Sequence, residues 1–340
     1  MKAILHDAYG PPEVLKLAEV PKPVVEDGEV LVRVHAASVN PADWHLMRGD
    51  PYIARLSFGP RKPRDRVPGC DLAGRVEAVG GNVTTVQPGD EVFGSPFEHG
   101  LGAFAEFAAI SADLVAPRPA NLTLEQAATV PVAAMTALQG LRDHGRVEAG
   151  QKVLIIGASG GVGTFAVQIA KSLGAEVTGA CSAAKSELVR SVGADHVIDY
   201  AEEDFTAGAE RYDVIFQLGG TRSPSDCRRA LTSNGTLVLS SGEPAGRLFG
   251  PLGRVVKAMV VSPFVSERMV TFTVKPNRED LLALKELIEA GTVTPVIDRT
   301  YSLSEVPDAV GYLEEGNARG KVGVKIWRAT AESPSSSRPA

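Results

Sequence analysis

The sequence predicts an α/β protein in which a β-rich domain is joined to a doubly wound parallel sheet. Two observations lead to this prediction. The first 120 residues are short apolar stretches broken by turns such as Pro88-Gly89-Asp90, whereas strand and helix patterns alternate from Gln151 onward. The length of 340 residues fits two domains of roughly 100 to 200 residues each. Each half is therefore long enough to bury its own core.

Composition and charge exclude several classes of protein. Hydrophobic residues make up 44% and charged residues 22%, as in ordinary soluble globular proteins. The formal net charge is -6 without a basic stripe, which argues against nucleic acid as a partner. The N-terminal residues do not resemble a signal or transit peptide, and no apolar run reaches the ~20 residues of a membrane span. We therefore expect a cytoplasmic protein without a membrane partner.

The β-rich part leads into a helix. Residues Val30–Val34 alternate as in a half-buried strand. A helix is expected from Thr123 to Gly145, because Thr123 and Gln126 have the spacing of a capping box and glycine commonly ends a helix. Pro131 is expected to kink it.

Alternating strands and helices follow. Aliphatic and β-branched residues predict a helix over Gly161–Leu173, with its apolar side chains on one face, and five strands at Lys152–Ile156, Glu176–Ala180, His196–Tyr200, Asp213–Phe216 and Thr236–Ser240. A Leu-rich helix over Asn277–Ala290, stopped by Gly291, and a last strand at Val322–Trp327 complete the pattern.

The remaining segments are less regular. Residues 247–264 are apolar with three basic residues, and periodicity does not separate a membrane-touching amphipathic helix from the wall of a substrate pocket; we favour the pocket wall. The tail 328–340, rich in Ser, Pro and Ala, predicts disorder.

A glycine-rich loop at Gly157–Gly163 is the strongest functional signal. It lies where a predicted strand ends and a predicted helix begins, inside a βαβ unit of about thirty residues. Glycines there let the backbone approach a pyrophosphate, whose charge is met by the amide groups and dipole of the helix. The loop therefore predicts dinucleotide binding.

The end of the second strand indicates which dinucleotide is bound. An NAD site would place an Asp or Glu about 20 residues after the loop, on the ribose hydroxyls. The sequence has no acid there and offers Ser182 and Lys185, a hydroxyl and a cation suited to a 2′-phosphate. Alternatively, Ser182 caps the next helix and Lys185 is solvated. We favour NADPH.

The chain resembles the medium-chain dehydrogenase/reductase superfamily, and within it the zinc-independent quinone oxidoreductase group that includes ζ-crystallin-like and reticulon-interacting reductase-like proteins. The resemblance spans about residues 1 to 327. It rests on the glycine loop and on Ser38-Val39-Asn40-Pro41-Ala42-Asp43, Pro68-Gly69-Cys70-Asp71-Leu72-Ala73-Gly74-Arg75-Val76, Gln87-Pro88-Gly89-Asp90-Glu91-Val92, Gly193-Ala194-Asp195, Val197-Ile198-Asp199-Tyr200 and Ala318-Arg319-Gly320-Lys321.

The resemblance implies a GroES-like catalytic domain over 1–122, a Rossmann NADPH-binding domain over 123–270 and a return to the catalytic domain over 271–327. It also implies a cleft in which nicotinamide meets substrate. Tyr200 and Lys185 would flank the 2′-phosphate. Gln217 departs from the smaller amide of close relatives, which puts contacts along that strand end in doubt. The residues similar to the family's cofactor contacts are Thr136, Ser159, Gly160, Gly161, Val162, Ser182, Lys185, Tyr200, Leu218 and Arg319.

The sequence predicts that no metal is bound. Zinc-dependent members of the superfamily hold a catalytic zinc with a Cys, a His and a further Cys. The positions matching the first two ligands here are Asn40 and Cys70, and no cysteine lies near the third, around Met135. Cys70 is most simply a small buried apolar residue.

Three residues are candidates for the catalytic step. Asn40 would donate a hydrogen bond to the acceptor oxygen, or would instead bond its own backbone as a turn residue before Pro41. Asp43 would orient neighbours or bind the nicotinamide ribose, or would instead cap a helix. Tyr52 lies near a tyrosine proposed as proton donor in some relatives, but one extra residue makes the alignment uncertain, and we favour a role in lining the pocket.

These observations together predict a zinc-independent, NADPH-dependent reductase that transfers hydride to a quinone, an enone or a similar electron-poor carbonyl compound. Conjugation in such acceptors already delocalises the charge that a metal would otherwise stabilise. A zinc-type alcohol dehydrogenase and a non-catalytic NADPH-binding scaffold are the alternatives. The resemblance also suggests a homodimer formed through the nucleotide domain.

Overall fold

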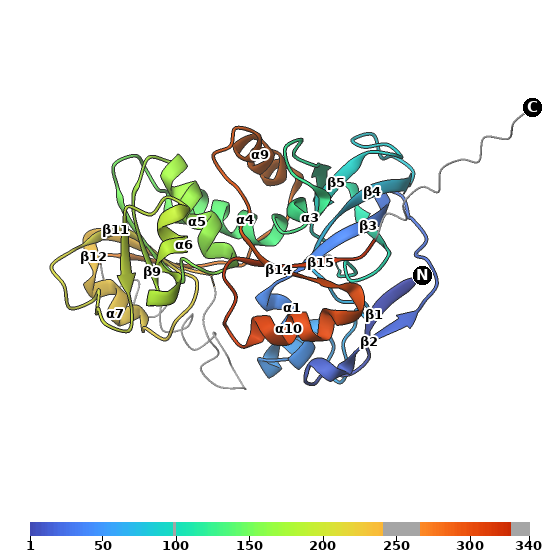
Figure 1. Ribbon diagram of the computed structural model, residues 1–340, viewed down its shortest axis with the longest axis horizontal. Coiled ribbons are helices and arrows are strands. Elements are labelled where there is room, and N and C mark those ends of the chain that lie inside the picture. Colours follow the sequence, from blue (N-terminus) through green and yellow to red (C-terminus); the bar gives the residue numbers. More distant parts are fainter. Residues whose placement is uncertain (98–99, 241–265, 328–340) are drawn as a thin grey trace, which may run out of the picture.

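The computed structural model describes residues 1–97, 100–240 and 266–327, which form two α/β halves (Figure 1). The predicted pocket wall at 247–264 and the predicted disordered tail at 328–340 lie outside these ranges. No helix within the described ranges is long and apolar enough to cross a membrane.

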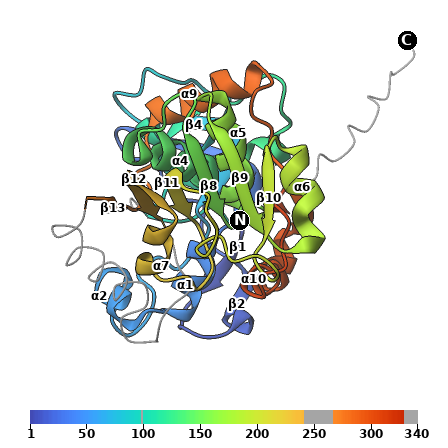
Figure 2. The same cartoon turned by 90° about the vertical axis from the view of Figure 1, so that its left-hand side faces the viewer.

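The nucleotide half is a six-stranded parallel sheet. Figure 2 shows its strands β12, β11, β8, β9 and β10 next to one another from left to right. Its order is β10-β9-β8-β11-β12-β13, and every neighbouring pair is parallel. The strands are β8 (Lys152–Ile156), β9 (Glu176–Cys181), β10 (His196–Asp199), β11 (Tyr212–Gln217), β12 (Leu231–Leu239) and β13 (Arg268–Thr271). The order reverses between β8 and β11, the position where α/β sheets bind ligands beyond their carboxyl ends. This confirms the predicted doubly wound fold.

Helices and short turns precede and connect these strands. They are α4 (Pro131–Leu138), η4 (Gln139–Gly145), α5 (Gly161–Ser172), η5 (Ala183–Lys185), α6 (Ser186–Ser191) and α7 (Pro224–Arg229). The bounds of β8, α5 and β9 agree with the predicted bounds to within one residue.

The catalytic half is built on a second sheet of order β14-β15-β3-β4-β5-β7, with β6 pairing to β3, beside the small sheet β1-β2. Its strands are β1 (Lys2–His6), β2 (Leu15–Glu19), β3 (Glu29–Val39), β4 (Asp71–Val79), β5 (Glu91–Gly94), β6 (Phe107–Ser111), β7 (Val115–Pro117), β14 (Ile297–Ser302) and β15 (Lys321–Lys325). Its helices and turns are η1 (Pro12–Val14), α1 (Pro41–Arg48), η2 (Tyr52–Ala54), α2 (Arg55–Phe58), η3 (Ala112–Leu114), η7 (Leu303–Glu305) and α10 (Val306–Glu314).

The chain thus leaves the catalytic sheet after β7 and returns to it with β14 and β15 (Figure 1). The domain boundaries at 122 and 270 themselves stay predictions. Two helices lie where the halves meet: α3 (Leu124–Ala127) contacts β3 and β4, and α9 (Arg278–Glu289) contacts both β7 and α4. One apolar cluster runs from Phe93 in the catalytic half through Met135 on α4 to Phe165 and Phe216 in the nucleotide half.

Two predicted elements differ from the structure. The helix predicted from Thr123 to Gly145 has the expected capping box, but it is divided into α3, α4 and the π-helical η4. The division before α4 follows from Pro131, which has no N–H to continue the hydrogen-bond ladder. Strand β12 begins five residues before the predicted Thr236, because its register against β11 jumps from Tyr212–Leu231 to Val214–Thr236 and the polar residues 232–235 form a bulge.

Candidate active site

The glycine loop has a backbone that only glycine accommodates at two points. Gly157 has a φ of +87°, and a Cβ on Gly163 would lie 2.2 Å from the carbonyl oxygen of Gly157. The loop is anchored to β9, because the N–H groups of Gly157 and Ala158 donate to the Ala180 oxygen at 3.0 and 3.2 Å. The first amide groups of α5 have no carbonyl one turn earlier to bind, so they are available to an anion.

The loop is also joined directly to the catalytic half. The N–H of Gly320 donates to the Ser159 oxygen at 2.9 Å, and Gly160 and Gly320 form an isolated parallel bridge. A Cβ on Gly161 would lie 2.8 Å from Cδ of Lys321, so the lysine stem passes close to the start of α5. The expected pyrophosphate site therefore lies next to Lys321, the first residue of β15.

Two cations and an exposed aromatic ring meet at the end of β9. Nζ of Lys185 donates to the oxygens of Gly316 and Ala318 at 3.3 and 3.0 Å, which brings it next to Arg319. Burial, together with repulsion from Arg319, lowers the pKa of Lys185. The parallel register pairs Asp199 with Cys181, so the exposed Tyr200 follows beside Ser182. Ser182 makes no capping hydrogen bond with its side chain. The arrangement suits a phosphate dianion, which would relieve the repulsion between the cations.

The other predicted cofactor residues lie around the loop. The Thr136 hydroxyl donates to the Val132 oxygen of its own helix at 2.7 Å. Leu218 directly follows β11 and its N–H donates to the Ile156 oxygen, so it borders the loop at Gly157. Val162 packs against the apolar cluster shared by the two halves. Gln217 is fully buried, and its Nε2 donates to the Arg222 oxygen at 3.0 Å, which directs the amide away from the loop.

The side chain of Asn40 belongs to a buried polar network that connects the two ends of the chain. Its Nδ2 donates to Oδ2 of Asp71 at 2.8 Å, and its Oδ1 accepts from Nζ of Lys321 at 2.6 Å. Lys321 and Asp71 form an ion pair at 3.3 Å whose side chains are 3% and 0% exposed. Ser38 Oγ and the Val132 N–H each donate to Asp71 at 2.8 Å. We call Ser38, Asn40, Asp71 and Lys321 the buried network.

Sequence reasoning did not assign roles to Ser38, Asp71 and Lys321, although all three occur in the motifs that carried the family resemblance. The sequence did contain a signal for two of them, because Asp71 and Lys321 are charged residues next to apolar strand residues, and a charged residue in such a place is buried only when it is paired.

Asp43 lies beside this network and caps a helix. Its Oδ2 accepts the backbone N–H of Asn40 at 2.7 Å at the start of α1, and Cys70 Sγ donates to Oδ1 at 3.3 Å. Burial raises the pKa of Asp43 to about 7, and burial with the nearby carboxylates raises the pKa of the Cys70 thiol. Of the two interpretations of Asp43 left open by the sequence, the geometry supports the capping role.

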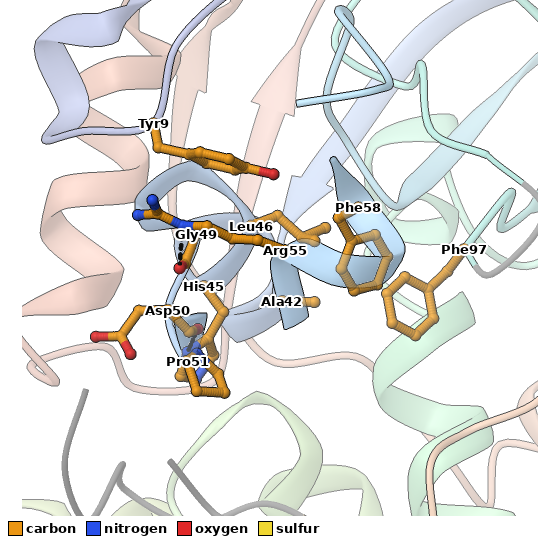
Figure 3. Close-up of a pocket in the computed structure, with 10 residues that line it drawn as sticks. All are labelled: Tyr9, Ala42, His45, Leu46, Gly49, Asp50, Pro51, Arg55, Phe58 and Phe97. Carbon is orange, nitrogen blue, oxygen red and sulfur yellow. Dashed lines mark hydrogen bonds between the residues drawn. The ribbon is translucent and has the colours of Figure 1, made fainter. Parts of the chain in front are cut away.

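A largely apolar pocket is lined in part by residues of α1 (Figure 3). Phe58 and Phe97 stand together at one end, and Asp50 and Pro51 lie at the other. The lining residues are Tyr9, Ala42, His45, Leu46, Gly49, Asp50, Pro51, Arg55, Phe58 and Phe97. Ala42, His45 and Leu46 belong to α1, whose first turn is capped by Asn40 and Asp43, so the pocket and the buried network border the same helix.

Tyr52 does not line this pocket. Tyr52 is 45% exposed and its ring stacks on the guanidinium of Arg55, which also stacks on the ring of Tyr9, each centroid 4.4 Å away. The guanidinium therefore separates Tyr52 from Tyr9, and the predicted role of Tyr52 in lining the pocket is not what this geometry supports.

The residues at the expected zinc-ligand positions do not fit a catalytic zinc. Cys70 is a protonated donor to Asp43, Asn40 is committed to the buried network, and Met135 is fully buried in the apolar cluster. Within the described ranges, no three His, Cys, Asp or Glu side chains gather as a metal site would require.

Comparison with known protein families gives matches to two regions of the chain. Residues 26–120 match the family described as "Alcohol dehydrogenase GroES-like domain", and residues 192–324 match the one described as "Zinc-binding dehydrogenase". The second description names a metal for which the corresponding ligand positions of this chain carry unsuitable residues.

Comparison with individual proteins gives matches over nearly the whole chain. The 2-methylene-furan-3-one reductase of Solanum lycopersicum is 35% identical over 333 residues, which cover 95% of this chain and 78% of the relative. The quinone oxidoreductase from Coxiella burnetii has a TM-score of 0.84 at 33% identity, covering 96% of this chain and 99% of that one. The Escherichia coli quinone oxidoreductase complexed with NADPH has a TM-score of 0.82 at 27% identity, covering 96% and 100%.

Proposed function

Because the chain belongs to the quinone oxidoreductase group of the medium-chain dehydrogenase/reductase superfamily, we propose that it is an NADPH-dependent reductase of quinones, enones and similar electron-poor carbonyl compounds. The observation that carries the proposal is the junction of the glycine loop with the buried network through Gly320 and Lys321. A cofactor held by the loop would extend from the Lys185–Arg319 pair toward Asn40, beside the apolar pocket.

The residues of the chain divide the work of binding and reaction. The amides of the glycine loop hold the pyrophosphate, and Lys185, Arg319 and Tyr200 hold the 2′-phosphate. NADPH, when bound, supplies the hydride. The apolar pocket would exclude water from the acceptor, and the Asn40 amide, which gives one Nδ2 hydrogen bond to Asp71, would offer its second N–H to the oxygen that gains charge. The overall reaction consumes one proton, so that a quinone becomes a hydroquinone.

The same residues support catalysis without zinc. Hydride transfer places negative charge on the oxygen of the acceptor. Where no metal polarises that carbonyl, a conjugated acceptor is favoured, because it spreads the developing charge over its own π system. The buried network and Asp43 leave no ligand set for Zn²⁺ among the described residues, which is a reason to place the zinc-type alcohol dehydrogenase second.

The test is NADPH oxidation by a panel of simple quinones and enones after dialysis against a strong chelator. Turnover that survives the chelator is expected. Chelator-sensitive oxidation of primary alcohols would instead favour the zinc enzyme, and tight NADPH binding without turnover on any acceptor would favour a scaffold protein.

The cofactor preference has its own test. Lys185→Ala should weaken NADPH binding by ten-fold or more and leave NADH nearly unchanged, because only NADPH carries the 2′-phosphate. The control is Arg190→Ala, which removes an exposed cation from the nearby α6. Titration of both variants with both cofactors, followed by nicotinamide fluorescence, measures the effect. Equal losses for NADPH and NADH would refute the phosphate role.

A cytoplasmic location and a homodimer complete the proposal. The edge strand β13 has only β12 as a neighbour within the described residues, so a second subunit could extend the nucleotide sheet there. Sedimentation velocity and cell fractionation test these two points.

A further inference from the structure

Exposed apolar side chains concentrate at one short segment. Six large hydrophobic side chains are exposed in the described part of the chain, and three of them, Tyr52, Ile53 and Leu56, fall within five residues. Leu56 is 74% exposed. The segment consists of the single-turn helices η2 and α2, and Figure 2 places α2 at the periphery of the molecule. Single exposed apolar side chains are common on protein surfaces, whereas exposed apolar side chains that gather at one place indicate a contact surface.

A basic loop follows directly. Residues 59–66 contain Arg61, Lys62, Arg64 and Arg66 against a single acid, Asp65. Arg66 is paired with Asp7 at 2.6 Å, whereas Arg61, Lys62 and Arg64 are exposed and have no ion pair recorded within the described residues. This local excess of positive charge occurs in a chain whose formal net charge is -6.

The basic loop is held against α2, so the charges and the apolar side chains share one edge. The N–H of Arg64 donates to the Phe58 oxygen at 2.8 Å, and the Tyr9 hydroxyl donates to the Gly59 oxygen at 2.7 Å. A Cβ on Gly59, whose φ is +120°, would lie 2.0 Å from the Lys62 oxygen, so the loop folds tightly on itself. We call residues 52–66 the basic apolar edge.

The same helix connects this edge to the pocket. Arg55 and Phe58 of α2 line the pocket (Figure 3). Leu56 lies between them in the chain and is exposed to solvent. One side of a single helical turn therefore faces the candidate acceptor site and the other faces outward.

We propose that the basic apolar edge docks the enzyme on an anionic lipid surface, with Ile53 and Leu56 among the acyl chains and Arg61, Lys62 and Arg64 at the headgroups. Charge complementarity favours lipid as the occupant, because apolar side chains beside unpaired cations are the combination that binds such surfaces. The acceptor would then be a lipophilic quinone that reaches the pocket from the bilayer. This second part rests on the proposed quinone reductase activity, whereas the docking itself does not.

Sedimentation with vesicles tests the docking. The full-length protein is mixed with vesicles of phosphatidylcholine alone or with 30% phosphatidylglycerol, and binding is expected only to the anionic vesicles. Since each basic residue near such a surface contributes about a five-fold increase in partitioning, the triple variant Arg61→Ser/Lys62→Ser/Arg64→Ser should bind about 100-fold more weakly. Raising the salt concentration should weaken wild-type binding in the same direction.

Matched controls separate docking from general charge and hydrophobicity. Lys16→Ser/Arg190→Ser/Arg211→Ser removes the same charge from exposed sites elsewhere and should change binding less than three-fold. Leu56→Ser should weaken binding several-fold, whereas Val24→Ser, at a residue 84% exposed on another segment, should not. Equal binding to neutral and anionic vesicles, or equal losses in the test and control variants, would overturn the proposal. So would a change of oligomeric state in Leu56→Ser, which would assign the edge to a second copy of the chain.

Activity assays keep the docking and the proposed function distinguishable. The triple variant should reduce a water-soluble quinone at the wild-type rate and lose at least ten-fold in rate on a long-chain quinone embedded in anionic vesicles. Loss on the embedded quinone alone supports docking. Failure of the wild type on both quinones would contradict the proposed function while leaving the vesicle-binding result to decide the docking.

Discussion

The two halves of the candidate site are built in opposite ways. The glycine loop of the cofactor side is a contiguous run of seven residues, Gly157–Gly163, whose function depends on backbone conformation and on the absence of side chains at its glycines. The buried network on the catalytic side is assembled from segments up to 283 positions apart, from Ser38 to Lys321, and depends on charged side chains without access to water. The conformation of a loop can therefore be predicted from one stretch of sequence, whereas the formation of a buried charge network depends on how the strands are paired.

The largest expected effect comes from breaking the buried network. Lys321→Met would leave the Asp71 carboxylate buried without its cation, which costs about 3–5 kcal/mol of the free energy of unfolding. Lys325→Met is the matched control in the same strand, because Lys325 pairs with Glu125 at 3.2 Å with both side chains nearly half exposed, a pair worth about 1 kcal/mol at most. Urea unfolding of both variants measures the difference. Similar losses in the two variants would mean that the network does not carry the stability inferred for it.

The sequence predicted the cofactor side and missed this network for a physical reason. Strand β8, helix α5 and the loop between them are specified by residues adjacent in the chain, and their bounds were predicted to within one residue. The network requires that β3 pair with β4 so that Ser38 lies opposite Asp71, and with β15 so that Val39 lies opposite Val322. Neither register can be read from one sequence, since β3, β4 and β15 each carry several apolar residues and more than one alignment would bury them. Asn40 and Asp43 were identified as polar residues of interest, but their partners were not.

A second prediction concerns the pH dependence of stability on the catalytic side. The folded-state pKa of Asp43 is about 7, and in the unfolded chain an Asp titrates near ~3.9. The folded protein therefore binds the additional proton between these values, and its free energy of unfolding falls as the pH rises from about 4 to about 7. Relative to Asp43→Asn, the wild type should lose on the order of 2–4 kcal/mol between pH 5 and pH 8. Urea midpoints at several pH values give this curve.

Asp226→Asn is the control for Asp43, because Asp226 occupies the same third helical position in a capping box but is solvated. Hydrogen bonds from Ser223 lower its pKa, so its contribution has the opposite sign and is lost only as the pH falls through the folded pKa, below the usual Asp range. A wild type whose stability did not decline between pH 5 and pH 8 relative to Asp43→Asn would exclude a protonated Asp43.

On the cofactor side, a methyl group should suffice to cause damage. Gly163→Ala would ordinarily stabilise a helix by about 1 kcal/mol, but its Cβ would lie 2.2 Å from the Gly157 oxygen and would push the loop backbone away. We expect NADPH affinity to fall by ten-fold or more. Gly208→Ala, whose Cβ would have no atom nearer than 4.0 Å, should leave affinity unchanged. Calorimetric titration with NADPH compares the two, and unchanged affinity in Gly163→Ala would show that the loop geometry tolerates movement.

The smallest effect is expected at Tyr52, on the catalytic side. A catalytic role was suggested for this residue by its sequence position alone. The ring of Tyr52 stacks on Arg55, and Tyr52 is nearly half exposed and is not among the residues that line the pocket. Its hydroxyl is therefore not placed to protonate an acceptor bound in the pocket. Tyr52→Phe keeps the stacking and removes only the hydroxyl, and kcat should change less than three-fold, with a pH profile unchanged in shape. A general acid contributes about 10²–10⁴-fold, so a loss of that size together with a lost basic limb of the profile would return Tyr52 to the reaction as proton donor.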